Sequence, residues 1–168
     1  MREVKPYNKA EISKLQKLIV GLIVDNIGYS VNTPLEDNCI SINFTNGGLL
    51  NIYALSRISI GKTIVLCSAD YYFDKNFCEK TNPQQVKETL MDIALQKTNE
   101  ALKNGVITEV KANNYGDLTI VIGSDKCIEI YFDTPEIEKD YYTYYTEDES
   151  FSLCKIEDRT VIIEDLNE

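Results

Sequence analysis

Short segments in which apolar and polar residues alternate make up most of this 168-residue chain, and they constrain its fold more than any other feature. Alternation with a period of two places successive side chains on opposite faces, so each segment predicts a half-buried β-strand. Turn residues such as Asn46-Gly47-Gly48 and Gly61-Lys62 separate neighbouring segments, as in antiparallel hairpins. The predicted strands are 39–44, 49–60, 63–73, 106–110, 117–122, 126–132, 141–146, 151–156 and 160–163.

Two other segments have helical periodicity. Apolar residues between Asn8 and Ile27 recur every three or four positions, which predicts a first helix that Gly28 ends. A second helix is predicted to start at Asn82-Pro83-Gln84-Gln85, which combines an N-cap, a proline at the first helical position and a capping-box glutamine. Its apolar face continues to Leu102, and Gly105 is expected to stop it.

The order of these elements predicts an α+β fold: a mainly antiparallel sheet of about eight or nine strands with two helices packed on it. A helix followed by a meander occurs twice, and Asn46–Ile52 can be set against Asn114–Ile120. This order allows a helix-plus-meander duplication with halves at 1–81 and 82–168. The length suits a single domain spanning 1–168.

Residue types that are missing or isolated exclude several function classes. Histidine is absent, which excludes catalytic triads and zinc sites that need imidazole. The five cysteines include no CxxC pair, so we expect reduced thiols and a cytoplasmic location. The apolar run Leu18–Val24 is too short to span a bilayer and has no cleavage pattern after it, so we expect neither a membrane segment nor a signal peptide.

The negative charge is concentrated in the last forty residues. Residues 1–128 contain 14 basic and 14 acidic side chains, whereas residues 129–168 contain 3 and 13, which accounts for the whole net charge of −10. A neutral body with one acidic region has a directional field that steers a cationic partner. The same balance argues against nucleic acid as a ligand, because phosphate contacts need clustered Lys and Arg.

The centre of this acidic region is rich in tyrosine. Aromatic rings give large contact area at low entropic cost, so tyrosines between carboxylates favour a docking surface for a basic protein. The candidate contact residues are Asp140, Tyr141, Tyr142, Tyr144, Tyr145, Glu147, Asp148 and Glu149. The alternative is an ordinary strand in which Tyr142 and Tyr144 share one face, Tyr141 and Tyr145 share the other, and one face belongs to the core. An edge position would favour docking, because an unpaired edge can accept a partner strand.

Two other functions fit the residues. Asp70, Asp74, Glu129 and Asp133 flank aromatic strand ends and could serve a metal-dependent hydrolase, if the fold brought them together. Alternatively, the chain is a structural or adaptor protein that self-associates through sheet edges.

A small, acidic, cysteine-containing α+β chain with a Tyr and Asp/Glu surface and no catalytic signature resembles the immunity proteins of bacterial contact-dependent growth inhibition and related polymorphic toxin systems. The resemblance implies a cytoplasmic protein, without cofactor or catalytic residues, that binds and neutralises one cognate toxin domain, often a basic nuclease. It implies no direct contact with nucleic acid or membrane, and we expect a monomer.

Overall fold

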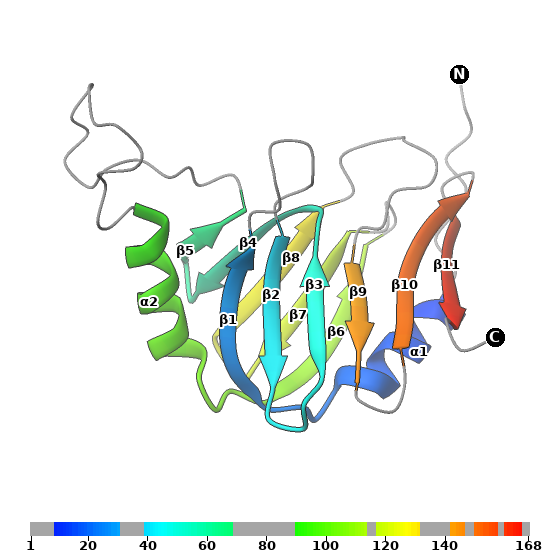
Figure 1. Ribbon diagram of the computed structural model, residues 1–168, viewed down its shortest axis with the longest axis horizontal. Coiled ribbons are helices and arrows are strands. Elements are labelled where there is room, and N and C mark those ends of the chain that lie inside the picture. The colour runs from blue at the N-terminus through cyan, green and yellow to red at the C-terminus, as the bar shows by residue number, and fades with distance from the viewer. Residues whose placement is uncertain are drawn as a thin grey trace, which may run out of the picture.

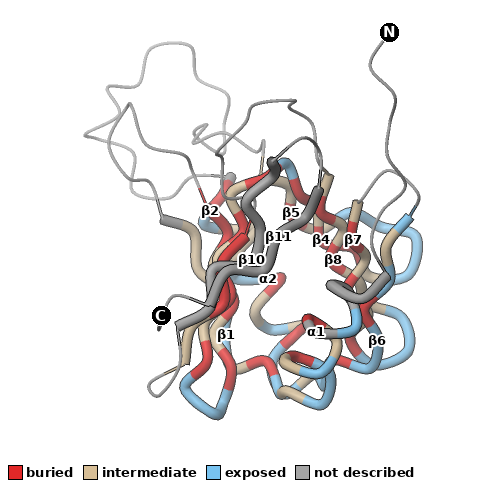
Figure 2. The backbone as a smooth tube through the Cα atoms, turned by 90° about the vertical axis from the view of Figure 1, so that its right-hand side faces the viewer, coloured by how far each residue is buried: buried red, intermediate tan, exposed pale blue. Residues whose placement is uncertain are grey.

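Two antiparallel β-sheets lie face to face, and a helix stands at each of the two open sides between them (Figure 1). Figure 2, turned by 90°, shows the two layers and the buried residues along their strands. This computed structural model describes residues 9–30, 39–68, 90–113, 117–131, 142–146, 150–157 and 160–165, the last two segments as backbone.

Each sheet is a continuous ladder of neighbouring strands. The six-stranded sheet has the order β1 (Val24–Ser30), β2 (Cys39–Phe44), β3 (Leu49–Ile52), β9 (Tyr142–Tyr145), β10 (Ser150–Glu157) and β11 (Thr160–Asp165). The five-stranded sheet has the order β5 (Thr63–Cys67), β4 (Leu55–Ile60), β8 (Lys126–Tyr131), β7 (Leu118–Ile122) and β6 (Ile107–Ala112). Helix α2 (Leu90–Leu102) contacts the edge strands β1 and β5, and α1 (Lys9–Ile19) contacts the opposite edges β6 and β11.

The inner faces of the two sheets form one apolar core. Side chains with at most 1% exposure come from both layers: Ile40, Ile42, Leu50 and Ile52 from one, and Ile58, Ile120, Ile128 and Ile130 from the other. Burying each such side chain stabilises the fold by roughly 1.5–3 kcal/mol. The apolar residues of each predicted strand therefore lie in this core, and the residues that alternate with them lie on the outer faces of the two sheets.

The predicted α+β class and antiparallel pairing are confirmed, but the strands number eleven in the described residues and form two sheets instead of one. One additional strand is β1, which was expected to be helical. The other additional strand and the second sheet arise in 49–60, which was expected to be one strand. Tyr53 and Ala54 separate β3 from β4, and the chain passes there from one sheet to the other. Because Leu50, Ala54 and Ile58 all face the shared core, the alternation continues through the crossing and gives no sign of it.

The first helix is shorter than predicted, and its predicted end is wrong. Helix α1 stops at Ile19, Gly21 has a φ of 92°, and Gly28 lies within β1. The chain after Gly21 enters strand pairing instead, since Gly21 N donates to Ile107 O (2.8 Å) and Ile107 N to Leu22 O (2.9 Å). Val24 and Ile27 are buried there, whereas Ile23 is 38% exposed. An apolar run is ambiguous between helix and strand, which explains the error.

Helix α2 ends at Leu102, three residues before the predicted stop. Asn104 takes the left-handed conformation there with a φ of 63°. Gly105 is required for another reason: a Cβ atom on it would lie 2.5 Å from Ile122 Cγ2 and 2.9 Å from Leu102 O. The predicted capping sequence Asn82–Gln85 lies outside the described residues.

The topology contains a repeat. Helix α1 leads into the meander β1-β2-β3, and α2 leads into the meander β6-β7-β8. The hairpin that follows each meander extends the other sheet: β4-β5 joins β8, and β9-β10 joins β3. Strands from 1–81 and from 82–168 therefore pair in both sheets.

In the helix and the first strand of each repeat, residues 83 positions apart occupy equivalent places. Gln16 and Asn99 are such a pair, and so are the edge-strand residues Ile27 and Val110. Asn99 Nδ2 donates to Ile27 O (2.8 Å), and Gln16 Nε2 donates to Val110 O (2.6 Å). In each half an amide side chain from the helix thus covers the edge strand of the opposite meander, and exposed edges invite unwanted pairing.

The order of elements thus agrees with a duplication, but the predicted hairpin alignment is wrong. The turn at 45–48 joins β2 to β3, so its equivalent is the turn at 123–125 between β7 and β8. The segment around 114–116 stands between β6 and β7 instead. Assigning β1 to a helix had shifted the first meander by one strand.

Candidate functional site

The tyrosine strand β9 lies in the middle of the six-stranded sheet and not at an edge, the position that would have favoured docking. It pairs with β3 through Leu50↔Tyr144 and Ile52↔Tyr142, and with β10 on its other side. Tyr142 and Tyr144 are each only 2% exposed. Including these two tyrosines in a contact surface was therefore wrong, because the second sheet covers the face on which they stand.

Tyr144 is fitted closely into the core. Its ring meets Phe44 edge-on, with 6.2 Å between the ring centroids. A Cβ atom on Gly48 would lie 2.7 Å from the Tyr144 hydroxyl oxygen, so only glycine leaves room for this ring. The aromatic side chains of the inner face therefore serve packing.

Of the predicted contact set, Tyr145 is described and half-buried on the outer side of the sheet. Asp140, Tyr141, Glu147, Asp148 and Glu149 lie outside the described residues. The last three stand between Thr146 and Ser150 in the sequence, and Ser150 pairs with Tyr145.

The outer side of β1, β2, β3 and β9 bears no charged side chain in the two rows that strand register defines, although Asp25 lies at its border, and we call this surface the neutral face. Strand register places its residues in two rows: Asn26, Asn43, Leu49 and Tyr145, then Gly28, Ser41, Asn51 and Thr143. Thr143 is 2% exposed, Asn26 is exposed, and the other six are half-buried or, for Gly28, partly open.

Hydrogen bonds connect the side chains of the neutral face. The Ser41 hydroxyl donates to Asn51 Oδ1 (2.7 Å), and Asn43 Nδ2 donates to Asn26 Oδ1 (2.8 Å). Asn26 Nδ2 donates in turn to the carboxylate of Asp25 (3.0 Å), the bulged residue of β1 at the border of the face. These bonds hold the polar groups in fixed orientations before any partner arrives.

Tyr53, which directly follows β3, adds a second aromatic ring to the neutral face. Burial raises the pKa of its hydroxyl above the usual value, while the polar side chain of Asn51 opposes that rise. The Tyr145 side chain is close enough to raise the pKa of Tyr53 further. Tyr53 and Tyr145 therefore form an uncharged aromatic pair beside the polar rows.

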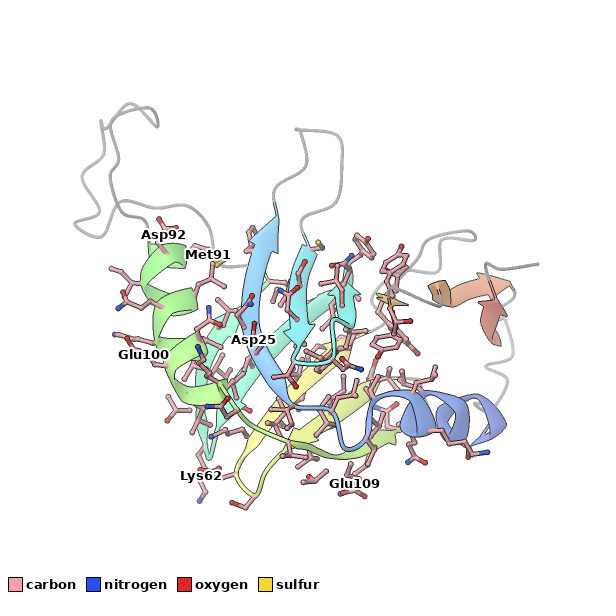
Figure 3. All side chains as sticks on the ribbon, turned by 60° about the horizontal axis from the view of Figure 1, so that its bottom comes forward. Asp25, Lys62, Met91, Asp92, Glu100 and Glu109 are labelled. Atoms are coloured by element: carbon pink, nitrogen blue, oxygen red, sulfur yellow. The ribbon has the colours of Figure 1, made fainter. Side chains whose placement is uncertain are left out.

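The repeat provides a second sheet surface with which the neutral face can be compared. The eight equivalent positions on the outer side of β6, β7, β8 and β4 include four charged residues, where the neutral face has none. Register places Lys111, Thr119, Glu129 and Arg57 in one row and Glu109, Val121, Cys127 and Ser59 in the other. Figure 3 shows Lys62 and Glu109 at the five-stranded sheet, and Asp92 and Glu100 on α2.

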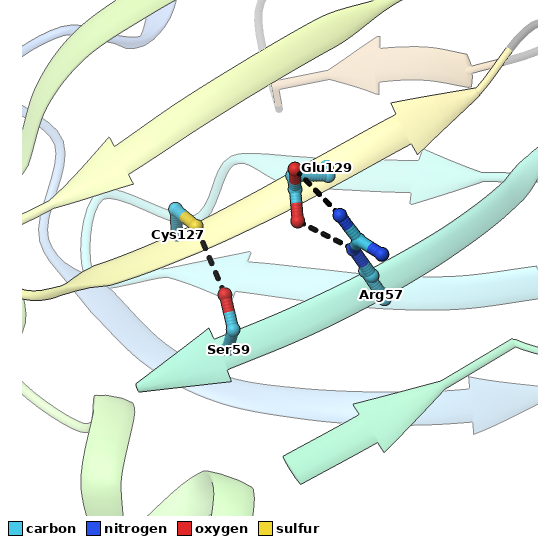
Figure 4. A network of polar contacts seen from close by, with 4 residues as sticks. All are labelled: Arg57, Ser59, Cys127 and Glu129. Carbon is cyan, nitrogen blue, oxygen red and sulfur yellow. Dashed lines mark hydrogen bonds and ion pairs between the residues drawn. The ribbon is translucent and has the colours of Figure 1, made fainter. Parts of the chain in front are cut away.

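The charged residues on the outer side of β6, β7, β8 and β4 form ion pairs with one another, one of which is shown in Figure 4. Arg57 Nε and Nη2 donate to the Glu129 carboxylate at 2.5 and 3.0 Å, and the Arg57 guanidinium lies 5.2 Å from the Tyr131 ring centroid. Lys111 Nζ lies 2.7 Å from Glu109 Oε2. Beside the Arg57 pair, the Ser59 hydroxyl and the Cys127 thiol are 3.0 Å apart.

The carboxylates considered for a metal site are not brought together in the described structure. Glu129 is held by Arg57, whose hydrogen bonds lower the pKa of the Glu129 carboxyl. Asp70, Asp74 and Asp133 lie outside the described residues. Among the residues that the structure places, no three His, Cys, Asp or Glu side chains are arranged to hold a metal ion.

Sequence reasoning missed the neutral face because it searched one segment at a time. Ser41, Asn43 and Asn51 are ordinary outward residues of their strands, and they meet Thr143 and Tyr145 only through β3–β9 pairing. A usable signal was present, since the outward positions of 39–52 contain no charged residue. Neither helix in the described part of the chain is long and apolar enough to cross a membrane. Comparisons with protein-family models, curated proteins and solved structures found no match to this chain.

Proposed function

We propose that this chain is an immunity-type inhibitor that binds a basic toxin domain, such as a nuclease, in the cytoplasm. The contact surface is the neutral face together with the acidic segments that adjoin β9. One observation carries the proposal: the outer side of β1, β2, β3 and β9 is free of charge at positions where the equivalent face has two ion pairs.

The composition of the neutral face is that of a protein-binding surface. Interface centres are depleted in charged residues and enriched in tyrosine, and recognition loops of antibodies combine Tyr with Ser and Asn. Tyr53, Tyr145, Asn51, Asn43 and Ser41 supply these residue types on one sheet surface. Their mutual hydrogen bonds reduce the entropy lost on binding, because the side chains are already oriented.

The acidic segments add direction to this surface. Glu136, Glu138 and Asp140 precede β9, and Glu147, Asp148 and Glu149 follow it. Carboxylates around a docking site accelerate encounter with a basic protein and can occupy the place of the phosphates that a nuclease binds. A neutral centre with an acidic surround therefore suits inhibition better than catalysis.

Co-expression with a toxin tests the proposal. The carboxy-terminal domain encoded by the reading frame directly upstream is expressed with or without this chain in a sensitive strain, and survival is counted. We expect the chain to restore growth, and the purified pair to form a 1:1 complex. Failure to bind or protect against a toxic upstream domain contradicts the proposal.

Two charge variants then locate the surface. Replacing Glu147, Asp148 and Glu149 with lysine should slow association and flatten its dependence on salt. The matched control replaces the exposed residues Asp92, Glu100 and Asp125, which gives the same net charge away from the neutral face. Equal association rates for both variants would remove the acidic segment from the interface.

A further inference from the structure

A groove of about 430 Å³ lies between helix α1 and the outer edge of strand β6, on the sheet that does not bear the neutral face. Its lining includes Gln16, Lys17 and Val20 from the end of the helix and Thr108, Glu109 and Val110 from the strand. Val110 is fully buried, whereas Val20 is 41% exposed and gives the groove an apolar rim. The groove therefore connects a buried strand edge with the surface of the protein.

The backbone of Val110 points into this groove. Asn113 N donates to Asp117 O (3.0 Å), so Asn113 and every second residue before it face β7, and Val110 faces away. Its carbonyl accordingly accepts a hydrogen bond from Gln16 Nε2 (2.6 Å). Its N–H points the same way and has no hydrogen-bond partner within the described part of the chain. Buried backbone donors are nearly always paired, so this N–H requires an acceptor.

The equivalent place in the other half of the repeat is closed. Asn99, which corresponds to Gln16, accepts from Ile27 N (2.5 Å) and donates to Ile27 O (2.8 Å), so no donor is left over there. Glu100 occupies the position that corresponds to Lys17. The half with the unpaired donor thus also has a cation where the closed half has an anion.

The groups in the groove favour an anionic acceptor. Lys17 is exposed, and none of the described residues forms an ion pair with it. Glu109, the acid in the lining, is itself paired with Lys111 Nζ (2.7 Å).

The arrangement of these groups also limits the kind of acceptor. A peptide strand needs an acceptor on the edge as well as a donor, and Gln16 already occupies the Val110 carbonyl. One N–H and one ammonium group match the two oxygens of a carboxylate. The nearby Glu109 carboxylate opposes a dianion such as phosphate more strongly than it opposes a monoanion.

We infer that this groove binds a carboxylate group, with Val110 N–H and Lys17 Nζ as its donors and Val20 against the apolar part of the ligand. The volume of the groove is in the range of small-molecule sites. A short-chain monocarboxylic acid and the carboxyl terminus of a peptide share this chemistry. The inference is independent of the proposed function, which uses the other sheet.

Amide chemical shifts of the isotope-labelled full-length chain test this site. Butyrate represents the free acid, N-acetylvaline represents a peptide terminus, and butyramide is the uncharged control, all at constant ionic strength. We expect both acids to shift the Val110 amide resonance saturably in the millimolar range, and butyramide to leave it unchanged. The Ile27 amide is the internal comparison, because its N–H is already bonded to Asn99, and it should not shift.

A pair of lysine variants assigns the binding to the groove. Lys17→Met keeps the aliphatic stem and should weaken the binding of both acids about tenfold, as expected for the loss of one charge-assisted contact. Lys103→Met is the matched control, since Lys103 is an exposed lysine directly after α2, and it should bind both acids as wild type does. The acid with the higher affinity identifies the source of the carboxylate as a free acid or a peptide terminus.

The inference is overturned if neither acid shifts the Val110 resonance. It is equally overturned if butyramide or inorganic phosphate binds as tightly as the acids, or if Lys17→Met binds them as wild type does. None of these outcomes bears on the toxin experiment, which uses a foreign protein.

Discussion

Asn99 is the residue whose replacement should most clearly test the packing of helix α2 on the edge of the six-stranded sheet. Its side-chain amide accepts a hydrogen bond from Ile27 N (2.5 Å) and donates one to Ile27 O (2.8 Å), so it occupies the place of a neighbouring strand's peptide group. The Ile27 side chain is 3% exposed, and water has limited access to this part of the edge.

Asn99→Ala removes both bonds and leaves one donor and one acceptor of the backbone without a partner. Each such group costs about 1–3 kcal/mol when buried, and less where partly exposed, while alanine returns about 0.5 kcal/mol of helix propensity. We expect a net loss of about 2–3 kcal/mol in the free energy of unfolding. For a chain of this size that lowers Tm by roughly 5–10 °C.

Urea denaturation of three variants provides the comparison. Gln96→Ala is the control, since Gln96 is exposed on the same helix and bonds only Glu100 across one turn (3.1 Å); it should change stability by less than about 0.5 kcal/mol. Gln16→Ala removes the single equivalent bond to Val110 and should cost about 1 kcal/mol. A loss for Asn99→Ala no greater than for the control would refute the edge-capping explanation.

Asn99→Asp adds a dependence on pH. The carboxylate can still accept from Ile27 N, but its second oxygen faces Ile27 O. The ionised form is disfavoured there, so the folded pKa of the introduced carboxyl is raised above its unfolded value. The stability deficit relative to wild type should therefore shrink as the pH falls through the folded pKa. A deficit that is constant between pH 7 and pH 4 would contradict this geometry.

Four other replacements test the site. Tyr144→Ala should lower the free energy of unfolding by about 3–5 kcal/mol, whereas Tyr145→Ala should cost under about 1 kcal/mol and act on partner binding instead; similar losses for both would contradict their placement. Gly48→Ala should cost about 1–3 kcal/mol in urea denaturation, because its methyl group meets the Tyr144 hydroxyl. Glu129→Gln should cost less than about 1 kcal/mol at pH 7, since the Arg57 side chain is 41% exposed. The lowered pKa of Glu129 means that this difference is present above the unfolded pKa and disappears as the pH falls through the folded pKa.

Periodicity identified the strands well, because one shared core enforces alternation on both sheets. It could not identify which strands pair when they are distant in sequence. Tyr53 and Ala54 show no change of pattern where the chain moves between sheets, and nothing local to Tyr142 or Tyr144 indicates that β9 inserts beside β3. Long-range pairing decided which face of each strand is covered, and with it which tyrosines were available to a partner.

The candidate site was predicted only in part, because it too depends on pairing between strands that are distant in sequence. The charge asymmetry followed from composition, and the two-residue period separated Tyr142 and Tyr144 from Tyr145 without indicating which side faces outward. The neutral face did not, since Ser41 and Asn51 become neighbours of Thr143 only through pairs distant in sequence. The internal repeat contains one signal that the sequence does show. Gln16 and Asn99, 83 residues apart, each donate a side-chain hydrogen bond to an edge strand, and a comparison of the two halves by position would reveal this pair.

The exchange of hairpins between the two meanders has a consequence for biosynthesis. Strand β3 is made before residue 60 and its neighbour β9 only after residue 140, so one side of β3 stays unpaired while more than half of the chain is translated. Such long-range pairing slows folding, and an unpaired strand on a nascent chain is open to aggregation. A ribosome that stalls before Tyr142 would release a chain lacking the centre of a sheet, so the last part to be synthesised controls when the first becomes stable.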